Sequence, residues 1–131
     1  MSQENVEIVR AGFEIWNAQD MDAFRDLLHS DVVLRNPEGW PEPGPFVGRE
    51  AVMDQFEQSR AIWDHDELEP IGEFIEAGGC VVIRDVWHGR GRSPDADMEF
   101  THVFTMRKGL ISFVEIYWDH AEALEAVGLR E

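Results

Sequence analysis

The sequence predicts an α+β fold, with helices concentrated in the first half of the chain and an antiparallel sheet in the second. Up to residue 63, most apolar residues recur at the spacing of helices that bury one face. From residue 68 onward the pattern changes to strands joined by glycine-containing turns. Such an order is typical of a two-layer fold, so we expect a curved sheet that wraps around the helices.

Two helices are expected first, over residues 3 to 18 and 21 to 28. The apolar residues that share one face of the longer helix are Val6, Val9, Phe13 and Trp16. Asp20 is the expected N-cap of the shorter helix. A short strand over residues 32 to 36 follows, and four prolines between residues 37 and 45 exclude regular structure there.

A third helix is expected to begin at Gly48, with an apolar face that extends to Trp63. The acidic run over residues 64 to 67 is expected to follow it as a solvated turn. Four antiparallel strands come next, over residues 68 to 76, 80 to 88, 97 to 107 and 110 to 118. The last helix is expected to begin at its N-cap, Asp119, and to end at Gly128.

Composition excludes several classes of function. Eleven Lys and Arg residues against 27 Asp and Glu residues give a net charge of −16, which opposes binding to nucleic acid or to anionic membranes. A single domain over residues 1–131 is expected, because this length suffices for one core. The lone Cys80 excludes a disulfide within the chain, and the first residues contain no basic segment or long apolar run. We therefore expect an acidic, soluble, cytoplasmic protein.

The strand over residues 97 to 107 places a histidine among apolar side chains. Phe100, His102 and Phe104 alternate with polar residues, so His102 is expected on the apolar face. A neutral imidazole there can donate a hydrogen bond to an oxygen or accept a proton near neutral pH. The alternative is a core histidine that is satisfied by a backbone carbonyl or by water.

The preceding strand carries Arg84 and Asp85 in succession, so one of these two charges must point inward. If Asp85 points inward, its carboxylate lies beside the face that bears His102. The alternative is an ion pair between Arg84 and Glu73, with Asp85 on an exposed edge. Alternation by itself leaves both arrangements open.

The turn between the last two strands decides which residue lies opposite His102. A two-residue turn places Glu115 there, whereas a turn longer by one residue places Val114 or Ile116 there. The sequence therefore leaves a second acidic partner for His102 open.

Other acidic and reactive residues have simpler explanations. Asp64, His65 and Asp66 resemble a metal-binding cluster only superficially, because no second histidine accompanies them. Asp119 is explained as a helix N-cap, and Cys80 as a small core residue. We therefore expect neither a metal nor an organic cofactor.

Three short motifs and the order of the elements carry a family resemblance. The motifs are Gly48-Arg49-Glu50 at a helix start, Val86-Trp87-His88-Gly89 in a strand, and the ending Ile116-Tyr117-Trp118. They resemble the NTF2-like superfamily, especially its ketosteroid isomerase and SnoaL-like polyketide cyclase branches, over nearly the whole chain. The resemblance implies a conical α+β barrel with a deep apolar pocket between sheet and helices, commonly dimeric.

The family's functional residues are only partly present. The general-base Asp of the isomerases lies in an Asp-Pro step that matches Asn36-Pro37 here, and their two pocket tyrosines match Gly12 and Phe56. Their protonated oxyanion-hole Asp matches His102, which keeps a hydrogen-bond donor at that place. In the SnoaL-like cyclases a His lies there, paired with an acid where this chain has Ile116.

The match at Val86-Trp87-His88-Gly89 also implies an orientation for that strand. Asp85 then faces the pocket, and Glu115 is assigned to the outer face. The residues that match pocket-facing, substrate-binding positions are Trp16, Phe56, Ile83, Trp87, Phe104, Val114, Ile116 and Trp118.

Two functions fit these residues. In the first, the domain is an enzyme that isomerises, cyclises, dehydrates or hydrolyses an apolar cyclic molecule bearing a carbonyl, hydroxyl or epoxide group. Asp85 is then the base or orients His102, His102 is the acid or hydrogen-bond donor, and Asn36 holds a substrate oxygen. In the second, the domain binds a ligand or a partner without catalysis. The expected partners are an apolar small molecule and a second copy of the chain on the outer sheet face, because several strands are apolar on both faces.

Overall fold

The computed structural model describes residues 2–91 and 94–129 of the chain. The helices are α1 (Ser2–Asn17), α2 (Met21–Arg25), α3 (Arg49–Arg60) and α4 (His120–Ala126). The strands are β1 (Leu28–Arg35), β2 (Phe46–Val47), β3 (His65–Ala77), β4 (Cys80–Arg90), β5 (Ala96–Arg107) and β6 (Leu110–Tyr117). No helix within these ranges is both long enough and apolar enough to cross a membrane.

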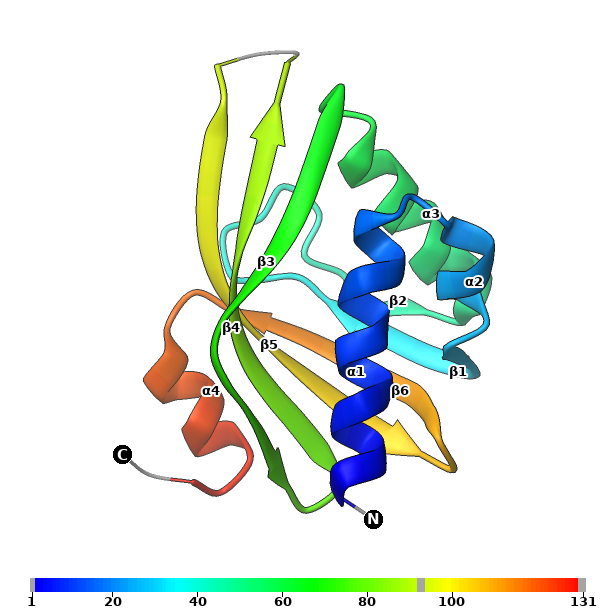
Figure 1. The fold of residues 1–131 in the computed structure, drawn as a ribbon, viewed down its shortest axis with the longest axis vertical. Coiled ribbons are helices and arrows are strands. Elements are labelled where there is room, and N and C mark those ends of the chain that lie inside the picture. The colour runs from blue at the N-terminus through cyan, green and yellow to red at the C-terminus, as the bar shows by residue number, and fades with distance from the viewer. Residues whose placement is uncertain (1, 92–93, 130–131) are drawn as a thin grey trace.

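Within the described ranges, six strands form one curved sheet in the order β2-β1-β6-β5-β4-β3 (Figure 1). Neighbouring strands are antiparallel except β1 and β6, which are parallel. The expected four-stranded meander is present as β3 to β6, and β1 and β2 extend the sheet beyond it. The expected NTF2-like α+β fold is confirmed, with a sheet that curves around the N-terminal helices without closing into a complete barrel.

Several expected boundaries are wrong. The helix expected over residues 21 to 28 ends at Arg25, and the strand expected over residues 32 to 36 begins at Leu28. The acidic run over residues 64 to 67 is not a solvated turn, because β3 begins at His65 and Asp66 is only 2% exposed. Helix α3 ends at Arg60, so Trp63 lies beyond it. Acidic residues are depleted in strands, so a local pattern favours a turn here. The partners that make this strand stable lie elsewhere in the sequence.

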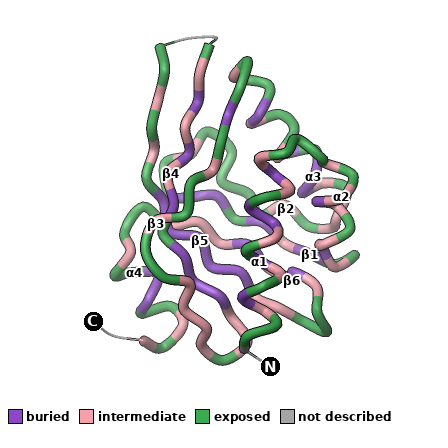
Figure 2. Tube along the Cα trace, in the orientation of Figure 1, coloured by how far each residue is buried: buried purple, intermediate pink, exposed green. Residues whose placement is uncertain are grey.

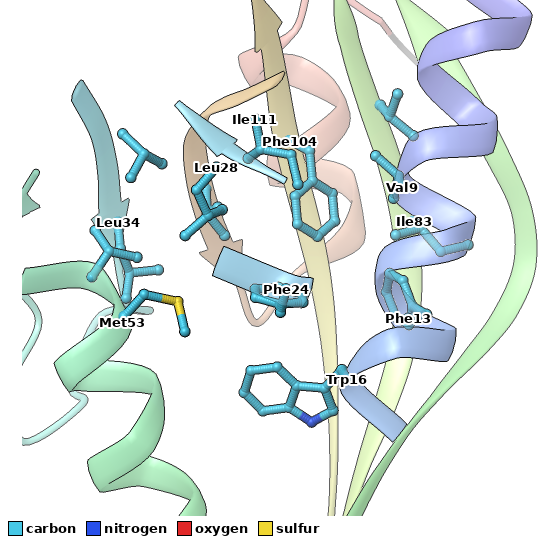
Figure 3. Close-up of a cluster of buried hydrophobic side chains, with 14 of the residues drawn as sticks. Val9, Phe13, Trp16, Phe24, Leu28, Leu34, Met53, Ile83, Phe104 and Ile111 are labelled. Atoms are coloured by element: carbon cyan, nitrogen blue, oxygen red, sulfur yellow. The ribbon is translucent and has the colours of Figure 1, made fainter. Parts of the chain in front are cut away.

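The concave face of the sheet packs against the helices as the periodicity predicts. Figure 2 shows buried positions along the central strands and on the sides of the helices that face them. Figure 3 shows Val9 and Phe13 of α1 beside the sheet residue Ile83, and the ring of Trp16 near Phe24 of α2. This layer of aromatic and aliphatic side chains is the main core of the protein.

Helix α4 covers part of the opposite face of the sheet, and Figure 1 shows it across the strands from the other helices. Its residues Ala123 and Leu124 form a second core cluster with Val82 of β4 and Val103 of β5. The sequence assigned the cover of this face to a second copy of the chain. In the structure the chain itself supplies part of that cover through α4.

Beyond α4, the outer face of β4 and β5 is charged. Arg84 donates to Glu99 at 2.8 Å, so the alternative pairing of Arg84 with Glu73 is not formed. His88 is held between two carboxylates, with its Nδ1 2.7 Å from Asp97 and its Nε2 2.8 Å from Glu69. The hydrogen bonds to Asp97 and Glu69 raise the pKa of His88. The bond from His88, followed by that from Arg90, lowers the pKa of Asp97.

We expect the His88 imidazole to titrate above the ordinary histidine value of about 6.5. Because its pKa is raised in the folded state, its stabilising effect is complete below pH ~6.5 and is lost as the pH rises through the raised pKa. NMR titration, with the signal assigned through His88→Gln, measures this pKa. Asp97→Asn should lower it, whereas Glu122→Gln on α4 should not. A pKa for His88 at or below about 6.5 would contradict the expectation.

Candidate functional site

An apolar cavity lies between the concave face of the sheet and the helices. It contains about 760 Å³ of space free of atoms, including space at its mouth. The polar side chains His102, Asn36 and Ser59 reach its wall among aromatic and aliphatic residues. Within the described part of the chain, no Asp, Glu, Lys or Arg lines it, and no group of three His, Cys, Asp or Glu is placed to hold a metal ion. The cavity therefore suits an uncharged, largely apolar molecule.

Most of the expected binding residues line this cavity, namely Trp16, Phe56, Trp87, Phe104, Val114 and Ile116. Ile83 and Trp118 do not lie on its wall. Ile83 faces the same side of the sheet, but it is covered by Val9 and Phe13 of α1 and belongs to the core (Figure 3). Trp118 lies beyond the end of β6, is 48% exposed, and packs against Phe100 with ring centroids 4.9 Å apart. Alternation gives a side chain's direction, but it does not show which neighbour covers it.

Further residues line the cavity that the sequence did not single out as binding residues. They are Val9, Gly12, Phe13, Phe24, Pro37, Trp40, Ser59, Leu68, Phe100 and Ile111. Val9 and Phe13 share the helical face of Trp16, and Phe100 shares the strand face of His102, so periodicity could have found them. Trp40 lies in the proline-rich loop, where no periodic signal exists.

Asp85 and His102 meet on the concave face of the sheet. Asp85 of β4 is 0% exposed, and its Oδ1 lies 2.8 Å from Nδ1 of His102 on β5. Asp85 does not line the cavity, whereas His102 does. Oδ2 of Asp85 has no hydrogen-bond partner among the described residues. The imidazole therefore lies between the buried carboxylate and the cavity.

Aromatic rings fix the orientation of the His102 imidazole. It is stacked on Phe104, with ring centroids 5.5 Å apart and planes 8° from parallel. Phe13 and Phe100 contact it edge-on at 6.3 and 6.1 Å. An ionised Asp85 can only accept a hydrogen bond, so Nδ1 then carries the hydrogen and Nε2 has the free lone pair. The site thus combines a held ring with one unoccupied nitrogen.

A β-bulge decides which residue lies opposite His102. Ser112 is an extra residue on β6, and beyond it the register pairs Ile116 with His102. Glu115 consequently points to the outer face, where it forms an ion pair with Arg35. The turn has the two residues Lys108 and Gly109, yet the pairing of Glu115 with His102 expected for that length is wrong, because the bulge places Ile116 there instead. Asp85 is therefore the acidic partner of His102.

Asn36 connects the cavity wall to the proline-rich loop. Its Nδ2 donates to the Glu42 carbonyl and its backbone N–H donates to the Pro43 carbonyl, both at 2.9 Å. One of its two amide hydrogens is thus used within the protein. The loop returns Trp40 to the cavity wall, where its ring lies 5.8 Å from that of Phe100.

A second buried carboxylate, Asp66 of β3, was missed by the sequence reasoning. Its Oδ2 accepts hydrogen bonds from Nε1 of both Trp16 and Trp87, each at 2.8 Å. Its Oδ1 accepts from Nε of Arg60 at 2.9 Å. The one local signal is that Asp66 precedes Leu68 by two positions and so shares its face of the strand. Its partners lie on three other elements and leave no mark in the local pattern.

A protein-family model of the SnoaL-like domain matches residues 9–114. The chain belongs to the SnoaL-like family. The matched segment includes Asn36, Asp66, Asp85 and His102, so both buried carboxylates lie within the family's domain.

Three solved structures resemble this SnoaL-like domain over most of its length. TerC, co-crystallised with polyporic acid, is 25% identical with a TM-score of 0.77 and covers 95% of this chain and 97% of its own. A putative polyketide cyclase from Sinorhizobium meliloti is 23% identical with a TM-score of 0.69, covering 84% and 93%. A protein of ketosteroid isomerase-like fold from Catenulispora acidiphila, in complex with trimethylamine, is 21% identical with a TM-score of 0.72, covering 94% and 93%.

A curated human protein, serine/threonine-protein kinase/endoribonuclease IRE2, is 35% identical over 77 residues. This match covers 47% of the SnoaL-like chain but only 8% of the human protein. It therefore concerns a short piece and carries no argument about activity.

Replacing Asn36 by Ala should lower the free energy of unfolding by about 1 kcal/mol, because the Glu42 carbonyl loses its donor. Urea denaturation measures this change. Glu42→Ala is the matched control, since only the backbone carbonyl of that exposed residue takes part. Equal stability of the two variants would contradict the structural role of the amide.

Proposed function

We propose that this SnoaL-like domain is an enzyme that moves protons on an apolar, cyclic molecule held in the cavity. The observation that carries the proposal is the placement of His102, whose ring lines the cavity while its Nδ1 is bonded to the buried Asp85. A general acid or base must reach its substrate and be held in one orientation, and this imidazole meets both conditions. His102 acts through Nε2, and Asp85 orients it.

The reaction can be followed for a ketone with hydrogen on the neighbouring carbon. Nε2 of His102 takes that proton, and the electron pair of the broken C–H bond forms the enolate, whose charge lies on the oxygen. The resulting imidazolium is stabilised by Asp85 at 2.8 Å. Where a C=C bond adjoins the carbon that lost the proton, the enolate extends over it as a dienolate, and returning the proton to the far carbon of that bond completes an isomerisation. The amide hydrogen of Asn36 that is not bonded to Glu42 is the donor proposed for the substrate oxygen.

Asp85 is assigned an orienting role rather than that of a base acting on the substrate. It has no exposed surface and does not line the cavity, so a substrate proton cannot reach it directly. Because Oδ2 of Asp85 has no hydrogen-bond partner among the described residues, the carboxylate can strengthen its interaction with His102 when the imidazole becomes charged, without breaking another bond. The co-crystal of TerC with polyporic acid supports a small organic ligand for this cavity.

The second candidate is a domain that binds such a molecule without changing it. Its support is that the isomerase-type base and both pocket tyrosines are replaced here, by Asn36, Gly12 and Phe56. Gly12 and Phe56 nevertheless lie on the cavity wall, where they offer apolar surface. Binding without proton transfer would identify this alternative.

The bicyclic ketone 2-tetralone in heavy water tests the proposal, because exchange of its hydrogen next to the carbonyl is visible by NMR. The protein should accelerate this exchange. His102→Ala should reduce the acceleration about 100-fold, and Asp85→Asn at least about tenfold, since an amide at Asp85 would donate to Nδ1 and place the hydrogen on Nε2.

The matched control is His65→Ala, which removes an exposed histidine and should leave the exchange rate unchanged. Exchange by the unmodified protein no faster than by His102→Ala would refute the proposed catalysis. Binding of 2-tetralone without exchange would then identify the binding domain.

We also propose that a second copy covers the outer face at the β2 edge of the sheet. Helix α4 lies over the cluster around Val82, whereas Val47 of β2 is 67% exposed and pairs with Val33, which in turn pairs with Phe113. This apolar strip bears an ion pair between Arg35 and Glu115.

Light scattering at micromolar concentration should therefore give a dimeric mass. Phe113→Asp should give the monomer, because it places a carboxylate in the apolar strip. Ile62→Asp, which changes an exposed apolar residue just after α3, should leave the dimer intact. A monomeric mass for the unmodified protein would refute the proposed dimer.

A further inference from the structure

The Asp66 carboxylate accepts three hydrogen bonds and forms an ion pair with Arg60. Nε and Nη2 of Arg60 lie 2.9 and 2.8 Å from Oδ1, and the indole nitrogens of Trp16 and Trp87 each lie 2.8 Å from Oδ2. The carboxylate is 2% exposed and Arg60 is 8% exposed. Hydrogen bonds to an ionised group are short and strong, so these contacts restrict the orientation of both indoles.

Arg60 adds two further restraints on Trp16. Its guanidinium lies over the indole ring, with Cζ 4.3 Å from the ring centroid, and its Nη1 donates to the Trp16 carbonyl at 3.0 Å. The ring of Trp16 in turn contacts Phe24 and Phe56 edge-on, each at 5.4 Å between centroids. The carboxylate therefore fixes a continuous group of rings rather than a single side chain.

Both tryptophans line the cavity, which gives this network a chemical consequence for the ligand. Each indole has one N–H, and Asp66 accepts both. The part of the wall made by Trp16 and Trp87 therefore offers ring surface and no donor. A ligand oxygen placed against it would lose its hydrogen bonds with water and gain none, which is unfavourable. His102 supplies a donor or acceptor on a different part of the wall.

We propose that Asp66 is a positioning residue that sets the orientation of the ligand. By holding Trp16 and Trp87 it forms a donor-free wall that receives the ring system of a neutral, fused-ring molecule, while the polar end of that molecule lies at His102 and Asn36. This inference rests on the proposed function and extends it, because it assigns which end of the ligand lies where.

Two probes separate the two ends of the ligand. 2-Naphthol has a fused ring and one hydroxyl, and naphthalene has the ring alone. The dissociation constant of naphthalene reports the wall, and the ratio of the two dissociation constants reports the hydroxyl at His102. The proteins compared are the unmodified chain, His102→Ala, and two double variants at Arg60 and Asp66.

The two double variants differ only in whether an acceptor remains for the indoles. Arg60→Met with Asp66→Leu removes the charges and the acceptor, whereas Arg60→Met with Asp66→Asn removes the charges but keeps an amide oxygen. Replacing both members of a buried ion pair avoids leaving one charge unpaired. The Leu variant should bind both probes about tenfold more weakly, with an unchanged ratio, because misplaced rings lose their packing on the ligand. The Asn variant should stay within about threefold of the unmodified protein.

Wild-type affinity in the Leu variant would overturn the proposal. Equal losses in the Leu and Asn variants would also overturn it, because the ion pair rather than the acceptor would then be responsible. If circular dichroism shows that the Leu variant is unfolded, Trp87→Phe replaces it, since this change keeps a ring and removes one donor. Unchanged naphthalene affinity in Trp87→Phe would overturn the proposal, and an equal weakening for both probes would support it.

The proposed function fails separately from this inference. A ratio of one in the unmodified protein, or a ratio unaffected by His102→Ala, would overturn the placement of the ligand's polar end beside His102, whereas the acid–base proposal is decided by the exchange of 2-tetralone. The role of Asp66 in holding the wall is decided by the naphthalene affinities of the double variants alone.

Discussion

The arrangement of the cavity depends on one buried carboxylate. Asp66 of β3 is bound by Trp16 of α1, Arg60 of α3 and Trp87 of β4, so a single side chain connects two helices and two strands. Apolar packing alone is not directional and tolerates many rearrangements, whereas these contacts require particular atoms at particular places. Helices α1 and α3 are thereby fixed relative to the edge of the sheet that borders the cavity.

The two buried carboxylates of the protein differ in how completely they are paired. Both oxygens of Asp66 have donors, and an arginine balances its charge. Within the described residues, Asp85 is bonded to the imidazole of His102 through one oxygen, and its second oxygen has no hydrogen-bond partner. A fully paired carboxylate suits a structural role, because any change of charge there would leave several groups unsatisfied. A partly paired carboxylate next to a titratable ring can strengthen its interaction with that ring when the ring becomes charged.

Local patterns predicted much of this molecule. Helical spacing identified the face of α1 with Val9 and Trp16, and strand alternation placed His102 on the apolar side of β5. Alternation left Asp85 undecided, and the family resemblance resolved it in the direction that the structure has. Helical and strand periodicities repeat every two to four residues, so a short stretch of sequence is enough to recognise them.

The features that escaped prediction depend on residues distant in sequence or on an irregularity of the backbone. Asp66 lies in an acidic run that resembles a solvated turn, and only its three distant partners explain its burial. Ile83 has the direction expected of a binding residue, yet the helix packed on it removes it from the cavity. The bulge lies at Ser112 rather than at a glycine or proline, so no local sequence signal predicts it.

The bulge at Ser112 also determines which residue of β6 lies opposite His102. Ser112 sets the phase of β6, because every residue after it faces the side opposite to the one it would face in an uninterrupted strand. If Ser112 paired with Thr105 instead of bulging, Glu115 would lie opposite His102 and Ile116 would turn outward. An imidazole with one buried acid would then become an imidazole with two acids, without substitution of any residue in the cavity. Deletion of Ser112 would not have this effect, because Phe113 would stay opposite Thr105 and Ile116 opposite His102. Substitutions around the bulge that favour a regular strand are thus a route between an aliphatic and an acidic neighbour for this histidine.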